Sequence, residues 1–294
     1  MVEPVETQST KTEIENFVWD DATPLWRAMR GDGSGRLKTV GVDGLQISAG
    51  NISGMSVIHK FGHAPDFDTG DGEVTIWDGA EDDAAWENMV YDYSTTADID
   101  SISSSKTADT VAIEVHGLDT NYNVVTTSAT LNGVTRVALS TAYIRVYRAK
   151  NIGSANLSGH VAVYPNTALT AGIPTDKSAI RILIHPENNQ TEMAIYTVPN
   201  GKSGYLDSFY ASVGGANKSS NYIIKLFVRP FGGVFQLKHR TVVSDDGSSR
   251  FQYNFSSPEK ILQKSDVHMT VETTAVGVTA TSVAGGFDII LVDD

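Results

Sequence analysis

The chain has 294 residues, of which 40% are hydrophobic and 19% are charged, a balance that excludes large-scale disorder. It contains no cysteine, which excludes disulfides, thiolate zinc sites and cysteine nucleophiles and fits a reducing compartment. The net charge is −13, and residues 61–165 carry fifteen acidic and five basic residues, a net of −10, so we expect no nucleic-acid partner there.

The first stretch, Met1 to Glu15, is polar and acidic. It lacks the basic start and the apolar centre of a secretory signal. No apolar run in the chain reaches the roughly 18 residues that a membrane-spanning helix needs. We therefore expect no membrane partner.

Residues 1–60 are predicted to form an extended N-terminal arm, because they hold too few apolar residues for a core of their own. Ile14, Phe17, Val18, Leu25 and Trp26 suggest one short amphipathic segment, which the glycines between Gly31 and Gly35 end. Apolar side chains on such an arm need another surface to cover them. The predicted partner-binding residues are Phe17, Trp19, Leu25 and Trp26.

Residues 61–165 are predicted to form a first β-sandwich of immunoglobulin-like type, because short β-branched runs recur there with turn signals between them. The expected strands cover residues 73–77, 99–103, 110–116, 124–131, 135–140, 143–150 and 160–164. Asn132-Gly133 predicts a tight hairpin between two of these runs. One helical turn is expected between Ala80 and Asn88.

Residues 166–176 contain Gly172 and Pro174 and are predicted to be a linker. Residues 177–294 are predicted to form a second, jelly-roll-like sandwich. Its expected strands cover residues 180–184, 192–198, 204–213, 222–229, 234–241, 249–255, 266–274 and 287–292. The fold class is therefore all-β, an arm followed by two sandwiches.

The acidic loop 66–73 invites two chemical interpretations. Phe67-Asp68-Thr69-Gly70 matches the core of the aspartic-protease motif, but the chain has no second Asp-Thr/Ser-Gly after an apolar pair, so a tight turn is favoured. Four carboxylates there suggest a weak possibility of calcium, although the spacing is not that of an EF-hand. These carboxylates belong to Asp66, Asp68, Asp71 and Glu73.

Other polar patterns have plain structural explanations. His59 and His63 have i, i+4 spacing, but Gly62 and Pro65 make a metal-binding helix there doubtful. Arg145, Arg148 and Lys150 form a basic strand, either a docking strip for an acidic partner or a charged, solvent-facing strand edge. We predict no catalytic residues, no cofactor and no metal, and hence no enzyme.

A set of short motifs is spread over residues 60–294. They are residues 60–62, 76–79, 115–123, 131–133 and 145–150 in the first predicted sandwich, and 195–202, 264–267 and 286–291 in the second. Together they resemble a family of virion structural proteins of tailed, podovirus-like bacteriophages. The family often continues with glycines after Trp77-Asp78-Gly79, whereas this chain continues with Ala80-Glu-Asp-Asp83.

The resemblance implies a non-enzymatic virion component that assembles in the host cytoplasm. The role we favour is that of a capsid decoration or cement protein, which binds the major capsid protein or other virion proteins. The chain is then expected to be a homo-oligomer, with a trimer favoured. The alternatives are a tail, neck or fibre-anchoring component, or a receptor- or glycan-binding module. For the last of these, Tyr91, Tyr93 and Tyr122 would be the sugar-facing aromatics.

Overall fold

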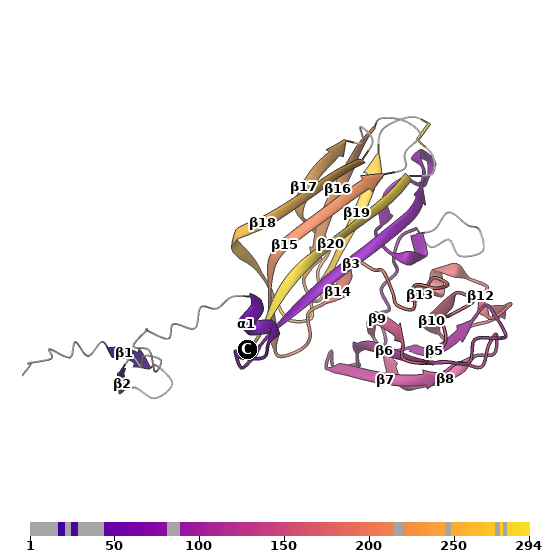
Figure 1. Cartoon of the computed structure of the whole chain (residues 1–294), viewed down its shortest axis with the longest axis horizontal. Coiled ribbons are helices and arrows are strands. Elements are labelled where there is room, and N and C mark those ends of the chain that lie inside the picture. Colours follow the sequence, from indigo (N-terminus) through magenta and orange to yellow (C-terminus); the bar gives the residue numbers. More distant parts are fainter. Residues whose placement is uncertain are drawn as a thin grey trace, which may run out of the picture. The chain divides into compact units, whose positions relative to one another are not determined.

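The computed structural model (Figure 1) describes residues 17–20, 25–28, 44–80, 89–214, 220–244, 248–273, 277–278 and 281–294. The chain divides into two compact units, Met1–Ile52 and Ser53–Asp294. In the first unit, strand β1 (Phe17–Asp20) pairs antiparallel with β2 (Leu25–Ala28), and helix α1 (Gly44–Ser48) follows. The single amphipathic segment predicted from the sequence is thus two paired strands. The helical turn expected between residues 80 and 88 lies mostly outside the described residues, apart from the 3-10 turn η2 (Asp78–Ala80).

Two antiparallel sheets of the second unit are built from strands distant in sequence. Sheet I has the order β18 (Ser248–Ile261), β15 (Lys202–Gly214), β20 (Thr281–Asp293), β3 (Met55–Phe67). Sheet II has the order β14 (Ile195–Thr197), β19 (Asp266–Thr273), β16 (Asn221–Arg229), β17 (Gln236–Ser244), and β4 (Val74–Thr75) pairs with β19 beside β14. Figure 1 shows these long strands running together.

The pairing between these strands is nested. The outermost pair is β3 with β20, then β4 and β14 with β19, then β15 with β18, and the innermost is β16 with β17. A long hairpin rolled up in this way places alternate strands in two sheets, which is the jelly-roll architecture. The prediction of a jelly roll near the C-terminus is confirmed, and β3 and β4 also belong to it.

A second sandwich is inserted between β4 and β14. One of its sheets has the order β13 (Ile182–Ile184), β10 (Val161–Pro165), β5 (Ile99–Ser104), β8 (Val137–Tyr143). The other has the order β7 (Val124–Thr130), β6 (Ala112–Leu118), β9 (Arg145–Asn151). We call these seven strands the inserted sandwich. The division into four and three strands matches an immunoglobulin constant-type domain, but the first strand, β5, lies inside its sheet rather than at the edge.

The predicted domain boundaries differ from the strand pairing. The boundary between residues 60 and 61 falls inside β3. The predicted linker 166–176 holds a small strand pair, β11 (Leu169–Thr170) with β12 (Ile173–Pro174). After it, the 3-10 turn η3 (Lys177–Ala179) leads to β13, which pairs with β10 of the inserted sandwich. The jelly roll therefore resumes only after the insert. There β14 pairs with β19 next to β4, so that β4 and β14 together form one outer strand of sheet II.

The Asn132-Gly133 turn forms, but the hairpin predicted around it does not. The Thr135 N–H donates to the Asn132 carbonyl at 3.0 Å, and Gly133 has a φ of 55°. The flanking strands part, since β7 pairs with β6 and β8 pairs with β5. The turn therefore carries the chain from one sheet of the inserted sandwich to the other.

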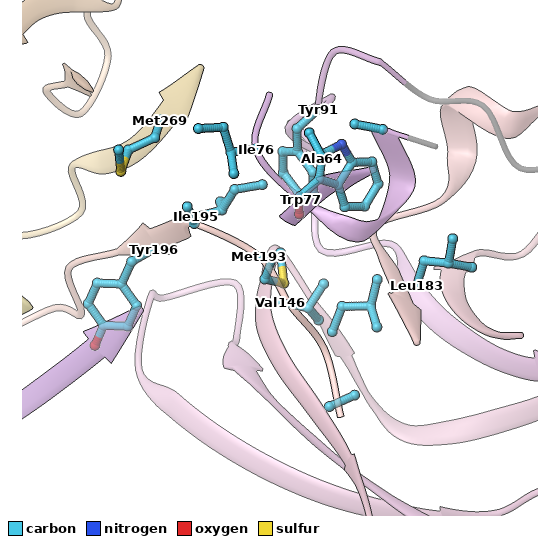
Figure 2. Packing of buried hydrophobic residues seen from close by; sticks show 14 of the residues in the cluster. Ala64, Ile76, Trp77, Tyr91, Val146, Leu183, Met193, Ile195, Tyr196 and Met269 are labelled. Atoms are coloured by element: carbon cyan, nitrogen blue, oxygen red, sulfur yellow. The ribbon is translucent and has the colours of Figure 1, made fainter. Parts of the chain in front are cut away.

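One continuous core joins the two sandwiches. The fully buried Trp77 ring meets Tyr91 edge-on, with 5.0 Å between ring centroids. Figure 2 shows Met193 next to Val146 of the inserted sandwich, with Ile76 and Ile195 on its jelly-roll side, and all of these residues belong to one buried cluster. Because a packed core resists deformation, the insert is held to the jelly roll by apolar contacts as well as by its two chain connections.

Candidate functional site

The insert leaves and rejoins the jelly roll at one point of the fold, formed by residues 77–78 and 192–193, which we call the neck. Trp77 and Met193 face each other in an isolated antiparallel bridge. The Asp78 N–H donates to the Glu192 carbonyl at 2.9 Å, and the Glu192 N–H donates to Asp78 Oδ2 at 2.6 Å. Asp78 is only 1% exposed, so its carboxylate accepts this hydrogen bond from the returning chain in a buried position.

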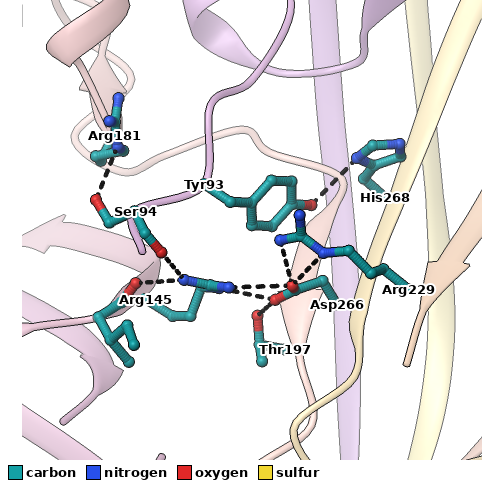
Figure 3. A network of polar contacts seen from close by, with 9 residues as sticks. Tyr93, Ser94, Arg145, Arg181, Thr197, Arg229, Asp266 and His268 are labelled. Carbon is teal, nitrogen blue, oxygen red and sulfur yellow. Dashed lines mark hydrogen bonds and ion pairs between the residues drawn. The ribbon is translucent and has the colours of Figure 1, made fainter. Parts of the chain in front are cut away.

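A charged network bridges the two sandwiches beside this point (Figure 3). Arg145 on β9 donates through Nε to Asp266 Oδ1 at 2.8 Å, and Arg229 on β16 donates through Nη2 to Oδ2 at 2.6 Å. The Thr197 hydroxyl also donates to Oδ1, at 2.6 Å. Burial acts to raise the pKa of Asp266, but the hydrogen bonds from Arg145 and Thr197 and the charges of Arg145 and Arg229 together hold that pKa below its usual value. Asp266 is therefore a buried carboxylate shared by two arginines.

Aromatic side chains enclose this network. The Arg229 guanidinium lies 4.6 Å from the ring centroid of Tyr93 and 4.5 Å from that of Phe235. The Tyr93 hydroxyl lies 3.1 Å from Nδ1 of His268. Burial lowers the pKa of His268 to about 4. His268 is consequently neutral at pH 7, and the network's charge comes from the two arginines and Asp266.

A cleft of about 520 Å³ lies on another side of the junction. Residues 57–61 of β3 line it on the jelly-roll side. His116 on β6, Tyr147 and Arg148 on β9, and residues 190–191 line it on the side of the inserted sandwich. We call this space the junction cleft.

Lys60 is the most unusual side chain of the junction cleft. It is 7% exposed, and its Nζ donates to the Tyr147 carbonyl. The pKa of Lys60 is lowered to about 7, chiefly by burial and also by repulsion from Arg148, while Asp78 acts in the opposite direction. A strongly shifted pKa in a concave site marks a candidate functional residue. Chemically, the arrangement suits the recognition of an anion.

The four predicted partner-binding residues lie on the two short strands of the first unit. Trp19 pairs with Trp26 in the β1–β2 register, Phe17 pairs with Ala28, and Asp20 pairs with Leu25. Phe17, Trp19, Leu25 and Trp26 are thus brought together on one strand pair at the level of the backbone. Their role in binding a partner stays a prediction.

The acidic loop 66–73 uses its carboxylates internally. Asp71 Oδ2 accepts from the Asp68 N–H at 2.6 Å. Glu73 accepts from Lys225 Nζ at 3.1 Å and from the Thr270 hydroxyl at 2.6 Å. In the described ranges no group of three histidine or acidic side chains is placed to hold a metal ion. The weak calcium interpretation of Asp66, Asp68, Asp71 and Glu73 gains no support from this geometry.

The basic strand divides its three cations among different tasks. Arg145 is buried in the Asp266 network, which corrects the expectation of a solvent-facing residue at that position. Lys150 Nζ lies 2.8 Å from Glu114 Oε1. Arg148 is exposed, and its Nη2 donates to Gln190 Oε1 at 3.4 Å. Arg145 and Lys150 of this strand thus form ion pairs within the chain, whereas Arg148 lines the junction cleft.

The three tyrosines proposed for glycan binding are buried. Tyr91 is 4%, Tyr93 8% and Tyr122 7% exposed. Tyr91 and Tyr93 pack against each other with 4.8 Å between ring centroids. The expectation of exposed aromatics at these positions is wrong, because Tyr91 packs on Trp77, Tyr93 on His268 and Tyr122 on Phe231.

Neither Lys60 nor Asp266 is predicted from the sequence as a site residue. Lys60 stands in the run Val57-Ile-His-Lys60-Phe61, where a polar pair between apolar residues shows no alternation that would mark Lys60 as buried. A weak signal existed in that strand, since a lysine among apolar residues is rarely buried without a partner. Asp266 follows Lys264-Ser265 and looks like part of a turn.

Comparisons with known proteins give no close relative. No protein-family model matches the chain, and no curated protein matches it in sequence. A solved structure of Broad Bean Stain Virus is 9% identical, with a TM-score of 0.19, over 70% of this chain and 91% of that chain. Infectious bursal disease virus, Gx strain, is 7% identical, with a TM-score of 0.22, over 81% and 72%. The VP2 subviral particle of infectious bursal disease virus is 8% identical, with a TM-score of 0.18, over 81% and 74%. At such scores these likenesses carry no argument, and the architecture rests on the strand pairing described above.

Proposed function

We propose that the chain is a non-enzymatic structural protein of a bacteriophage particle that decorates and cements the capsid. The observation that carries this proposal is the nested pairing of a complete jelly roll with one sandwich inserted into its outer strand. Viral capsid proteins use jelly rolls widely, although lectin domains and cupins share them. The resemblance of the motifs in residues 60–294 to phage virion proteins favours the viral use.

The first unit supplies the proposed means of attachment. A two-stranded ribbon such as β1–β2 is at best marginally stable alone in water. It gains stability when its apolar side chains are covered, at about 25 cal/mol for each Å² of apolar surface buried. We propose that Phe17, Trp19, Leu25 and Trp26 are covered by a neighbouring subunit of the shell. Repetition of this contact in a trimer and over the shell adds avidity.

The copy number of the chain in purified particles tests the proposal. Quantitative mass spectrometry against the major capsid protein is expected to give hundreds of copies, because decoration follows the lattice of the shell. Six or twelve copies would overturn decoration and favour the alternative of a tail, neck or fibre-anchoring component.

The absence of catalysis is part of the proposal and has its own test. Asp68 is the one residue for which the sequence suggests a protease. If Asp68→Asn abolished a cleavage of particle proteins that the unaltered chain supports, a non-enzymatic role would be wrong. We expect particles with Asp68→Asn to show the same protein pattern on a gel.

A further inference from the structure

The junction cleft carries an excess of positive charge. His59, Lys60, His116 and Arg148 line it. His59 Nδ1 lies 2.5 Å from Asp288, and His116 Nε2 lies 2.9 Å from Glu114. Lys60 and Arg148 have no carboxylate within 4.0 Å in the part of the chain that the structure describes; their partners are the Tyr147 carbonyl and Gln190. Neither side chain is therefore in an ion pair, and Asp78 attracts the Lys60 ammonium only from beyond that distance.

Keeping the Lys60 ammonium group buried without an ion-pair partner costs free energy. A buried ammonium group without an anionic partner is strongly destabilising, and such a group tends to lose its proton instead. The pKa of about 7 follows this rule. A carboxylate that entered the cleft would offset the cost and bring the ammonium form back. The cleft is therefore better matched to an anion than to water alone.

The backbone around the cleft suits an extended peptide. β3 is the last strand of sheet I and presents an edge at the cleft. The outer edge of β9 is already paired with residues 189–191, because Thr191 N–H donates to the Ala149 carbonyl and Asn151 N–H donates to the Asn189 carbonyl. A peptide in extended conformation can pair with such an edge through its main chain while its side chains enter pockets beside it. The β3 edge thus lies beside two basic side chains, Lys60 and Arg148, that form no ion pair.

We propose that the junction cleft binds carboxylate side chains of an extended acidic segment, and that its occupant is residues 1–16 of a second copy of the chain. This inference rests on the proposed assembly function and deepens it. Residues 1–16 hold four glutamates and one lysine, an excess of negative charge that complements Lys60 and Arg148. Glu13 and Glu15 are two positions apart, so in an extended strand their carboxylates lie on one side, about 7 Å apart. Cleft and segment then link one copy to the next.

Complementation between two variants tests the exchange directly. The cleft variant carries Lys60→Met and Arg148→Gln and keeps its acidic segment. The segment variant carries Glu13→Gln and Glu15→Gln and keeps its cleft. Sedimentation velocity on the full-length chains is expected to show each variant alone associating at least about tenfold more weakly than the unaltered protein, since charge-assisted hydrogen bonds are lost. An equimolar mixture is expected to associate more tightly than either variant alone, because segments of the first fill clefts of the second.

A matched control changes cations of the jelly roll away from the cleft. Lys238→Met with Arg240→Gln on β17 removes the same kinds of charge and is expected to leave association unchanged. Arg148→Gln alone, at an exposed position, keeps the test valid if Lys60→Met alters folding. Equal weakening by the control and the cleft variant would overturn the proposal, and so would a mixture no better than its components.

The proton on Lys60 gives a second readout. The groups that face Lys60 are His59 on its own strand, His116 on β6, Tyr147 and Arg148 on β9, and Asp78 at the neck. Between pH 7.5 and 9.5 free histidines stay neutral and glutamates stay charged, so a fall in association over this range reports Lys60. We expect this fall in the unaltered protein and not in Lys60→Met; a pH-independent association in both would contradict the inference.

Failure of this inference and failure of the proposed function are distinguishable. If the cleft variant associates normally while particles contain hundreds of copies, the function stands and the cleft does not bind the segment. If the unaltered protein does not associate at any concentration and particles contain six or twelve copies, both are wrong.

Discussion

Asp266 holds two arginines from two sandwiches, and its environment makes it the most sensitive residue of the junction. Asp266→Asn keeps the shape of the side chain but leaves Arg145 and Arg229 without their counter-charge. Removing one partner from a buried charge network costs about 3–5 kcal/mol. We expect urea denaturation at pH 7 to show a loss of stability in that range.

The control for this prediction is an exposed ion pair of the jelly roll. Glu259 Oε1 lies 2.8 Å from Lys238 Nζ, and both side chains are about one third exposed. Glu259→Gln is expected to cost less than about 1 kcal/mol, since solvent screens such pairs. A loss for Asp266→Asn no larger than that of Glu259→Gln would show that the network is not stabilising.

His268 makes the fold sensitive to acid. Its pKa is lowered by burial to about 4 in the folded chain, against about 6.5 in an unfolded one. The unfolded state binds more protons between these values, so stability falls as the pH drops from about 6.5 towards 4. His268→Gln is expected to reduce the loss of stability between pH 7 and pH 5 by about 2 kcal/mol.

The measurement for His268 is urea denaturation at the two pH values for both proteins. The ring also stacks on Phe235, with 4.3 Å between centroids, so the variant is expected to be less stable at pH 7. Only the change with pH tests the titration. An identical change in both proteins would place the acid-sensitive group elsewhere.

At the scale of elements, Gly62 in β3 sets how closely two strands approach. A Cβ added there would meet the Ile76 carbonyl at 2.3 Å and the Ala194 N–H at 2.4 Å, both backbone atoms. Gly62→Ala must therefore push β3 away from the segments that hold the neck of the insert. Because overpacking a rigid core typically costs 1–3 kcal/mol, we expect a loss of about 3 kcal/mol.

Thermal unfolding of Gly62→Ala and Gly70→Ala tests this. Gly70 has no atom within 4 Å of an added Cβ, so its substitution is expected to leave the unfolding midpoint within a few degrees of the original. Similar midpoints for both variants would mean that the close approach at Gly62 has no structural role.

Local patterns located most strands but not their partners. Alternation predicted residues 222–229, and the structure has β16 there, with Tyr222, Ile224, Leu226 and Val228 buried. The pairing of β3 with β20 joins Val57 to Ile290, and no short pattern encodes a contact over that separation. For this reason the sequence predicts residues 55–60 of β3 in the arm and residues 61–67 in the first sandwich.

The junction could not be predicted from the sequence for the same physical reason. Arg145 meets Asp266 across 121 positions, and either residue alone looks like a surface charge. The short outer strand β4 gave no sign that an entire sandwich follows it, because two residues are too few to show a period. Chemistry at domain junctions depends on such distant pairs.

At the scale of the whole molecule, the second unit is expected to fold without the first. Residues 53–294 contain both sandwiches and their shared core. A chain that starts at Ser53 is expected to keep the unfolding midpoint of the full chain and to lose self-association. Calorimetry and light scattering measure the two properties separately, and a truncated chain that still associates would contradict the role given to the arm.

No helix in the described ranges has the length and apolar character needed to cross a membrane.

The neck of the insert has a wider consequence for the chain. Trp77 and Met193 are opposite residues of one antiparallel bridge, and such partners are only about 4.5–5.5 Å apart. A different folded module with closely spaced ends, spliced between these two positions, would keep the nested strand pairs in register. The neck is thus a natural mounting point for displaying foreign protein.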